Sequence, residues 1–255
     1  MAERVGFYFT VYERLPEFLK RRVNPLEYSI RAFVESASQG TARSVVLDAG
    51  SGESRFAASF RRHLYVALDL GVGDPTWDYS KVGLLGDLSA IPLASETVDI
   101  VLNIQVLEHV VSPSRVFGEI HRVLKPGGTL YLTAPQGWHE HQSPHDYFRF
   151  TRDALRLLFL EAGFRDATIE PQGGYFHYLG HRLTYIPKVL FAGRSGLLRV
   201  LLFPLECLSL GMFCFCLPVV CYYLDRLDSK REFTLGYKCM AVKGAVAPSD
   251  SLQTG

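Results

Sequence analysis

The sequence predicts an α/β fold, because short apolar runs alternate with amphipathic stretches along most of its 255 residues. The strand-like runs are Ser44 to Ala49, Leu64 to Leu70, Val98 to Ile104 and Thr129 to Ala134. Neither an internal repeat nor a low-complexity segment interrupts this alternation. Apolar residues make up 48% of the chain, which is enough to bury the core of one domain, with or without an appendage.

Two helices follow from local capping signals. The first begins at Ser112 and Pro113, where serine can cap the helix and proline fits its first turn, and we expect the stretch from Pro126 to Gly128 to end it. The second starts after Thr151 and closes at Gly163, a residue typical of C-caps. Both stretches carry apolar residues at helical spacing, so each should bury one face.

Composition and charge exclude several classes of protein. The formal net charge of +1 gives no large basic field of the kind that binds nucleic acid, although local basic clusters such as Lys20 to Arg22 could still contact one. The amino-terminal stretch contains acids and no long apolar run before a small-residue cleavage site, so we expect no secretory signal and a cytoplasmic location. The five cysteines show no paired C-x-x-C spacing for zinc, which favours reduced thiols.

The stretch VVLDAGSGESRF, Val45 to Phe56, predicts a strand, a glycine turn and a helix amino terminus. A doubly wound sheet binds nucleotide-like ligands at such a turn. A nicotinamide-binding loop would carry a third glycine where Arg55 stands, which argues against a nicotinamide oxidoreductase. Asp48, immediately before the turn, suits a ligand with an ammonium or sulfonium charge better than a pyrophosphate.

Further acidic residues follow the next strands. Asp69 ends LYVALDL, where a carboxylate can accept both hydroxyls of a ribose. In GDLSAIPL, Asp87 can accept a hydrogen bond from an exocyclic amine, and Leu88 can contact a purine. VDIVLNIQVLEHV then supplies another strand and its exit loop. Because the carboxyl ends of parallel strands meet at one edge of a sheet, we expect these loops to share a rim.

This succession, closed by VLKPGGTLYLTAP, resembles the class I S-adenosylmethionine-dependent methyltransferases, in particular the ubiquinone-biosynthesis subfamily. The resemblance spans roughly Val45 to Phe164 and a final strand near Thr234 to Val242. It implies a Rossmann-like, doubly wound, mostly parallel seven-stranded sheet with S-adenosylmethionine as cofactor. The implied activity is methyl transfer to an O, N or C atom of a small, lipid-linked or glycan acceptor.

The resemblance also assigns the cofactor residues by position. The glycine loop would surround the amino-acid end of the cofactor, the second strand would contact the ribose, and the loop after the fourth strand would face the acceptor. The implied set is Asp48, Ala49, Gly50, Ser51, Gly52, Asp69, Leu70, Asp87, Leu88, Asn103, Ile104 and Gln105.

Two features depart from the family pattern. Ser54 stands where the family often has a third glycine, two residues after Gly52. The segment between Asp69 and Asp87 contains proline and several glycines, so an irregular connection is expected where the family commonly has a helix. Trp77 or Tyr79 in this segment would either cover the adenine or pack on the surface.

The catalytic candidates are His109 and His145, because a hydroxyl acceptor must lose a proton and histidine has a suitable unperturbed pKa. Glu108 belongs to the LEH element of the family and is a candidate acceptor contact. Tyr147 and Arg149, in the loop HEHQSPHDYFRFT, are further acceptor candidates if that acceptor is anionic or rich in hydroxyls. A structural role for Asp146 and Arg149 remains the alternative.

The same loop invites a metal interpretation, since His139, His141, His145 and Asp146 lie close together in sequence. A loop that follows a strand and contains a proline does not fix several ligands on one face. We therefore expect no metal from this spacing.

The run from Cys207 to Leu224 carries no charge and is long enough to cross a bilayer by the usual criterion of about 18 apolar residues. A single crossing conflicts with a last strand that must return to the same sheet. The longer apolar stretch that contains this run is also broken by Pro204, Glu206, Gly211 and Pro218. We expect two short helices that contact a membrane peripherally through residues 195–225, at the interface or as a hairpin. A buried cap or dimer interface is the alternative.

The predicted organisation has four parts. Residues 1–43 form an amino-terminal helical segment, residues 44–175 with 232–244 the cofactor-binding domain, residues 176–231 an apolar helical insertion, and residues 245–255 a flexible tail. The predicted protein is a cytoplasmic methyltransferase. The competing hypothesis is a methyltransferase-like scaffold without turnover at a membrane surface.

Overall fold

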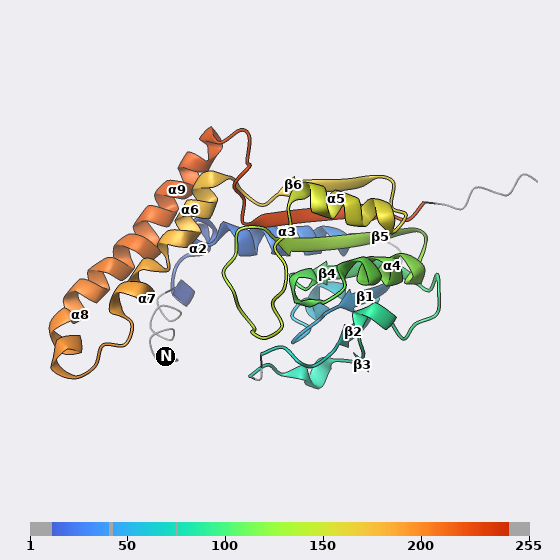
Figure 1. Cartoon of the computed structure of the whole chain (residues 1–255), viewed down its shortest axis with the longest axis horizontal. Helices are drawn as coiled ribbons and strands as arrows, with labels where there is room; N and C mark the ends of the chain where they lie inside the picture. Colours follow the sequence, from blue (N-terminus) through green and yellow to red (C-terminus); the bar gives the residue numbers. More distant parts are fainter. Residues whose placement is uncertain (1–11, 41–42, 75, 245–255) are drawn as a thin grey trace, which may run out of the picture. The chain divides into compact units, whose positions relative to one another are not determined.

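A computed structural model describes residues 12–40, 43–74 and 76–244 (Figure 1). By its internal contacts the chain divides into two compact units. The sheet unit comprises Phe33–Glu170 with Tyr237–Gly255, and the helical unit comprises Met1–Ala32 with Pro171–Gly236. The predicted tail 245–255 and the first eleven residues of the predicted amino-terminal segment lie outside the described residues.

The seven-stranded sheet has the order β3-β2-β1-β4-β5-β7-β6. Strands β1 to β5 pair in parallel. Strand β7 runs antiparallel to β5, because the Gly127 N–H donates to the Lys243 carbonyl at 2.8 Å and the Lys243 N–H donates to the Gly128 carbonyl at 2.9 Å. The mostly parallel, seven-stranded α/β fold is thereby confirmed. The strands are β1 (Val45–Ala49), β2 (Leu64–Asp69), β3 (Leu84–Leu85), β4 (Val98–Ile104), β5 (Leu124–Pro135), β6 (Ala167–Pro171) and β7 (Gly236–Val242).

Helices cover both faces of this sheet. Successive side chains of a strand point to opposite faces. On β5, Leu132 belongs to the core that contains Phe117 and Phe159, whose rings lie 4.9 Å apart in an edge-to-face arrangement. The neighbouring Tyr131 points the other way, with its ring 5.2 Å from that of Phe33. The first face is thus covered by α4 (Pro113–Val123) and α5 (Arg152–Glu161), and the second by the end of α3 (Pro25–Ala37).

The predicted helix ends are confirmed in part. Thr151 Oγ1 accepts a hydrogen bond from the Ala154 N–H at 3.2 Å, and Gly163 adopts a φ of 94°, as their caps require. The helix at Ser112 and Pro113 begins where predicted, with Ser112 at the N-cap and Pro113 in the first turn, but the Ser112 side chain makes no cap hydrogen bond. The predicted end of α4 is also too late: the backbone is extended from Leu124 onward, where it pairs with Val98.

The connection after β1 differs from the expected helix. A single 3₁₀ turn, η1 (Ala57–Phe60), links the glycine loop to β2, and Phe60 is fully buried. The connection after β2 is irregular, as predicted, with short 3₁₀ turns η2 (Tyr79–Lys81) and η3 (Leu88–Ala90) on either side of the two-residue β3.

In the helical unit, α6 packs antiparallel to α9. A Cβ placed on Gly180 of α6 would lie 3.0 Å from Cys221 Cβ of α9, so this glycine permits the close approach. Nearer the beginning of α6, the His177 and Tyr222 rings stack at 5.5 Å, and the buried Asp225 accepts a hydrogen bond from the His177 N–H at 2.9 Å. The helices are α2 (Glu17–Val23), α6 (Tyr175–Leu183), α7 (Ile186–Phe191), α8 (Gly196–Leu210) and α9 (Leu217–Leu224), with the π-helical η5 (Gly211–Cys216) and the 3₁₀ turn η6 (Asp225–Leu227).

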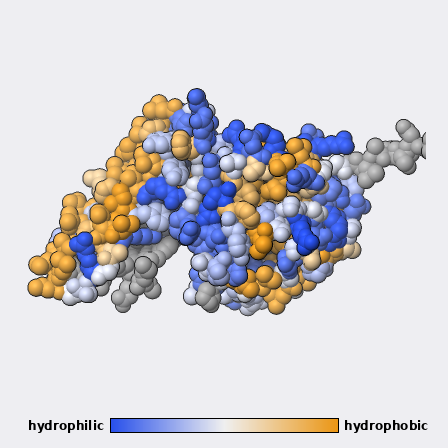
Figure 2. Space-filling model, in the orientation of Figure 1, coloured by the Kyte–Doolittle hydropathy of each residue, from blue (hydrophilic) through white to orange (hydrophobic). Residues whose placement is uncertain are grey.

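The apolar region forms one continuous helix, Gly196–Leu227, so the prediction of two short helices is wrong. The π turn η5 ends just before Pro218, which places a residue without an N–H donor in the first turn of α9. By length and composition alone this helix could cross a membrane: its 32 residues include a window of mean hydropathy 2.1, of which 11% is buried. Figure 2 shows hydrophobic residues along the exposed surface of α8 and α9.

Candidate active site

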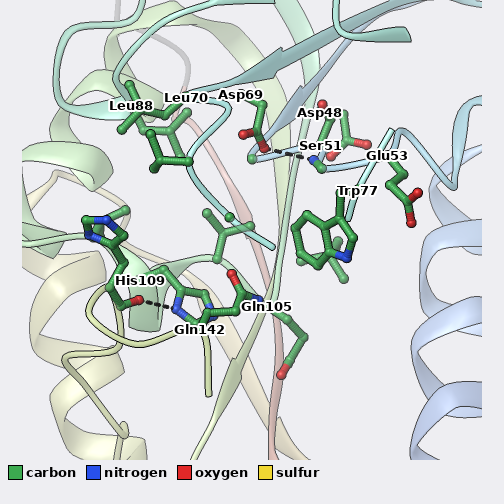
Figure 3. A pocket seen from close by; sticks show the side chains of 18 of the residues that line it. Asp48, Ser51, Glu53, Asp69, Leu70, Trp77, Leu88, Gln105, His109 and Gln142 are labelled. Carbon is green, nitrogen blue, oxygen red and sulfur yellow. Dashed lines mark hydrogen bonds between the residues drawn. The ribbon is translucent and has the colours of Figure 1, made fainter. Parts of the chain in front are cut away.

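A cavity of about 420 Å³ lies at the carboxyl ends of β1, β2 and β4, within the sheet unit. Figure 3 shows Asp48 and Asp69 beside the glycine loop and His109 at the other end of the cavity. Parallel sheets bind ligands at this edge, so the predicted rim is formed as expected. The lining comprises Asp48, Gly50, Ser51, Gly52, Glu53, Arg55, Phe56, Asp69, Leu70, Val72, Gly73, Trp77, Asp87, Leu88, Ile104, Gln105, Val106, His109, Val110, His141, Gln142 and His145.

The glycine loop brings backbone close to the cavity. Gly50 has a φ of 89°, and a Cβ built on it would lie 2.4 Å from a methyl carbon of Val106, so no other residue fits there without displacement. Ser54, the predicted departure from the family pattern, adopts a φ of 56°. This serine therefore takes the left-handed conformation that glycine adopts most easily.

Two carboxylates on the rim are oriented by backbone donors. Asp69 Oδ2 accepts a hydrogen bond from the Gly52 N–H and Oδ1 accepts one from the Gly71 N–H, both at 2.8 Å. Asp87 Oδ1 accepts the Ser89 N–H at 2.8 Å and begins η3. A carboxylate has about four lone-pair positions, so Asp69 retains acceptor capacity for the hydroxyls of a ligand.

Asp48 is more deeply placed, with 2% of its surface exposed. Its Oδ2 accepts a hydrogen bond from the Tyr65 hydroxyl. Burial raises the pKa of Asp48 to about 6, and burial beside Asp48 also raises the pKa of Tyr65. A cationic group entering the cavity would offset this desolvation cost.

Two of the predicted cofactor residues, Ala49 and Asn103, are fully buried and do not line the cavity. Asn103 is fully buried, and its Nδ2 donates to the Ala49 carbonyl at 2.9 Å, which ties the ends of β4 and β1 together. After β4, Gln105 adopts a φ of 57°, and its backbone N–H and Nε2 both lie 3.1 Å from Thr133 Oγ1. Left-handed backbone at a non-glycine residue often marks a functional site, and Gln105 lines this cavity.

Glu108 and His109 form the 3₁₀ turn η4 (Leu107–His109) at the far end of the cavity. Glu108 is fully buried, and neither of its carboxylate oxygens accepts a hydrogen bond from another described residue. His109 Nδ1 lies 2.5 Å from the His145 carbonyl, while Nε2 lies 3.8 Å from Glu108 Oε1. Burial raises the pKa of Glu108 to about 8 and lowers the pKa of His109.

His141 completes this group, which the sequence did not predict. One ligand-type atom from each of Glu108, His109 and His141 lies within 4.8 Å of the others. His141 lies in the loop after β5, whereas Glu108 and His109 follow β4, so spacing along the sequence does not show this group. Only the sheet topology brings the two segments together.

Arg149 is held by the loop that contains it. Its guanidinium donates to Asp146 at 2.7 Å, to the Trp138 carbonyl at 3.2 Å and to the His139 carbonyl at 2.6 Å. The pKa of Asp146 is accordingly held well below its usual range. These contacts favour the structural alternative for Asp146 and Arg149 over direct contact with an acceptor.

Of the remaining candidates, His145 lines the cavity, and its Nδ1 lies 3.2 Å from the Tyr147 hydroxyl. Tyr147 is 43% exposed and lies outside the lining, as do Glu108 and Arg149. Several lining residues were not predicted. Glu53, Arg55 and Phe56 could have been found from their place in the glycine loop, but Gln142 had no signal in the sequence.

Comparison with known proteins supports a methyltransferase. Residues 47–132 match the family model described as "Methyltransferase domain". The chain is 35% identical over 129 residues to an "Uncharacterized methyltransferase" of Mycobacteroides abscessus, covering 43% of this chain and 48% of the relative. It is 31% identical over 153 residues to a "Probable S-adenosylmethionine-dependent methyltransferase" of Mycobacterium tuberculosis, covering 55% and 54%. The chain thus spans about half the length of these relatives.

The fold has solved counterparts. A crystal structure of a SAM dependent methyltransferase from Archaeoglobus fulgidus matches with a TM-score of 0.54 at 14% identity, covering 89% of this chain and 99% of the other. Fold, rim and family match together support the class I S-adenosylmethionine-dependent methyltransferases. The ubiquinone-biosynthesis subfamily is not confirmed by these comparisons.

Proposed function

We propose that this chain is a methyltransferase that binds S-adenosylmethionine in the 420 Å³ cavity and methylates a small, lipid-linked or glycan acceptor at an O, N or C atom. One observation carries the proposal: Asp48, Asp69 and the glycine loop converge on a single cavity at the carboxyl edge of a parallel sheet. None of the findings favours the scaffold alternative.

The residues present fit this cofactor. The buried Asp48 suits a cationic ammonium, Asp69 has free acceptor capacity for ribose hydroxyls, and Leu70 and Leu88 offer apolar contacts for the adenine. The cofactor supplies a methyl group made electrophilic by a sulfonium sulfur, and the sulfur retains the electron pair of the bond that breaks.

The protein's own residues orient the acceptor and move its proton. Both histidines line the cavity, but His109 Nε2 is buried beside Glu108 and His109 Nδ1 lies 2.5 Å from the His145 carbonyl. Of the two histidine candidates, His145 is therefore the better placed to take a proton from an acceptor hydroxyl.

A thermal-shift panel tests the proposed cofactor class. A ligand that binds only the folded state at about 100 times its Kd stabilises a protein by about 2.7 kcal/mol. S-adenosylhomocysteine and sinefungin should therefore raise the melting temperature, whereas NADH and ATP at equal concentration should not. A larger shift with NADH would contradict the proposal.

The exposed surface of the long apolar helix supports membrane docking as part of this function. Leu201 and Leu205 are 67% and 53% exposed. Lys188 and Arg194 precede the helix, where they could meet anionic headgroups. A membrane-bound enzyme of this kind would receive a lipid-linked acceptor.

Vesicle flotation tests this part. The chain should float with vesicles of phosphatidylglycerol and phosphatidylcholine, and a Leu201→Ser, Leu205→Ser variant should bind them at least about tenfold more weakly. The matched control is Leu157→Ser, Leu160→Ser on α5, where both leucines are 56% exposed. Equal loss of flotation in both variants, or no flotation of the wild type, would contradict docking through this helix.

A further inference from the structure

We propose that Glu108, His109 and His141 form a binding site for a divalent transition metal ion such as Zn²⁺. The group comprises two imidazoles and one carboxylate, a donor set that suits zinc and other first-row divalent metals. Their three ligand-type atoms lie within 4.8 Å of one another. Shifts of less than about 1 Å would bring these atoms to the bond lengths of about 2.0–2.2 Å that zinc requires.

Both histidines are already oriented by their second nitrogen. His109 Nδ1 lies 2.5 Å from the His145 carbonyl, and His141 Nδ1 lies 3.1 Å from the His139 carbonyl. Because a carbonyl oxygen only accepts, each Nδ1 carries the proton and each Nε2 presents a lone pair. Metal-bound histidines in proteins are generally held by a backbone carbonyl or a carboxylate in this way.

Glu108 supplies the second, independent observation. Its side chain is completely buried, and neither oxygen accepts a hydrogen bond from another described residue. His109 Nε2 is likewise buried, has no hydrogen-bond partner among the described residues, and lies 3.8 Å from Glu108 Oε1. Leaving a carboxylate buried without partners is costly, and a cation bound between these atoms would remove that cost.

The site would open toward the acceptor. His109 and His141 line the same cavity as Asp69 and the glycine loop, so a metal held here by three ligands would offer its remaining position to the cavity. A bound divalent ion acts as a Lewis acid that lowers the pKa of a coordinated hydroxyl. This role rests on the proposed function and narrows the acceptor class to compounds that present a hydroxyl oxygen.

Cobalt titration of the untagged full-length chain tests the site. After chelation and removal of EDTA, Co²⁺ should bind with one equivalent per chain, give a visible absorption band and be displaced by Zn²⁺. Glu108→Gln and His141→Ala should each weaken Co²⁺ binding by more than about 100-fold. The matched control is His145→Ala, which removes a ring from the same loop but keeps the carbonyl that orients His109, and should bind Co²⁺ as the wild type does.

Circular dichroism and the S-adenosylhomocysteine thermal shift of each variant establish that it is folded. Wild-type protein that responds to S-adenosylhomocysteine but binds no stoichiometric Co²⁺ would overturn the metal site and leave the proposed function standing. Equal Co²⁺ affinity in all three variants would also overturn it. Stoichiometric Co²⁺ lost only in Glu108→Gln and His141→Ala, without any response to S-adenosylhomocysteine, would support the metal site while contradicting the proposed function.

Discussion

The two ends of the cavity differ in the hydrogen bonds that their carboxylates accept. In the cofactor half, which comprises the glycine loop with Asp48 and Asp69, the Asp69 carboxylate accepts two backbone hydrogen bonds at 2.8 Å. In the histidine half, which comprises Glu108, His109 and His141, the Glu108 carboxylate is buried and accepts none from another described residue. The cofactor half is thus arranged by the chain's own backbone, whereas the histidine half is complete only with a group from outside.

The largest expected effect comes from adding a side chain at Gly50, where the glycine loop of the cofactor half passes close to Val106. Gly50→Ala places a methyl group 2.4 Å from Val106 at a φ of 89° and should lower the free energy of unfolding by about 2–4 kcal/mol. Urea unfolding measures this loss. Gly118→Ala is the control, because its Cβ meets nothing within 4 Å on the exposed face of α4, and should stabilise by about 0.5–1 kcal/mol. A Gly50→Ala protein of wild-type stability would show that the loop is not constrained.

Neutralising the carboxylate of the histidine half should stabilise the protein instead. In metal-free protein, Glu108→Gln should raise the free energy of unfolding by about 1–3 kcal/mol. The reason is that the buried Glu108 carboxylate accepts no hydrogen bond from another described residue, and the substitution removes its charge. Urea unfolding against Glu119→Gln provides the contrast. That control breaks a 2.7 Å ion pair with Arg122 and should lose up to about 1 kcal/mol. Destabilisation by Glu108→Gln would mean that the two halves do not differ.

The pH dependence of ligand binding distinguishes Asp48 within the cofactor half. Its pKa of about 6 lies above the ordinary 3.8, so its contribution to stability is present below pH 3.8 and is lost as the pH rises through 6. Binding of a ligand through its ammonium group should have the opposite pH dependence, because it requires the ionised form of Asp48. S-adenosylhomocysteine affinity should fall by about tenfold from pH 7 to pH 5, because a proton must be released from Asp48.

Calorimetry in buffers of different ionisation enthalpy would count that proton. Asp48→Asn should remove the pH dependence while leaving weak binding. If the wild type showed constant affinity between pH 5 and pH 7, Asp48 would not face the charged part of the ligand.

Relaxing the glycine loop should have the smallest effect. Ser54→Gly removes the strain of a serine in the left-handed conformation, which costs about 1–2 kcal/mol. Glycine in turn loses more backbone entropy on folding, which costs about 0.5–1 kcal/mol. Stability should therefore rise by about 1 kcal/mol or less, and S-adenosylhomocysteine affinity should change less than twofold. A large loss of affinity would show that the serine side chain, not the backbone, is what the loop requires.

Much of the fold and the cofactor half could be predicted from the sequence, because local patterns encode them. The alternation that marks β1, β2 and β4 and the acids that follow these strands place the rim without any tertiary information. The helix expected after Phe56 is only a 3₁₀ turn, and the helix from Gly196 continues through its prolines. The short connection between β1 and β2 accounts for the first difference, and the π turn η5 within the long helix accounts for the second. Neither feature has a strong sequence signature.

The histidine half could not be predicted as a unit. Glu108 and His109 follow β4, whereas His141 lies in the loop after β5, and each segment alone has an ordinary interpretation. Their proximity depends on β4 and β5 being neighbours in the sheet and on the course of the later loop. Such long-range juxtaposition is the part of a site that spacing in a single sequence does not show.

The most direct test of the cofactor site is a calorimetric titration with S-adenosylhomocysteine at pH 7, using the wild type, Asp69→Ala and Glu108→Gln. We expect a Kd on the order of micromolar for the wild type, a loss of affinity of more than about 100-fold in Asp69→Ala, and a change of less than about threefold in Glu108→Gln. NADH should give no heat. A folded wild-type protein that gives no heat with S-adenosylhomocysteine, or an Asp69→Ala variant that binds it unchanged, would contradict the cofactor site.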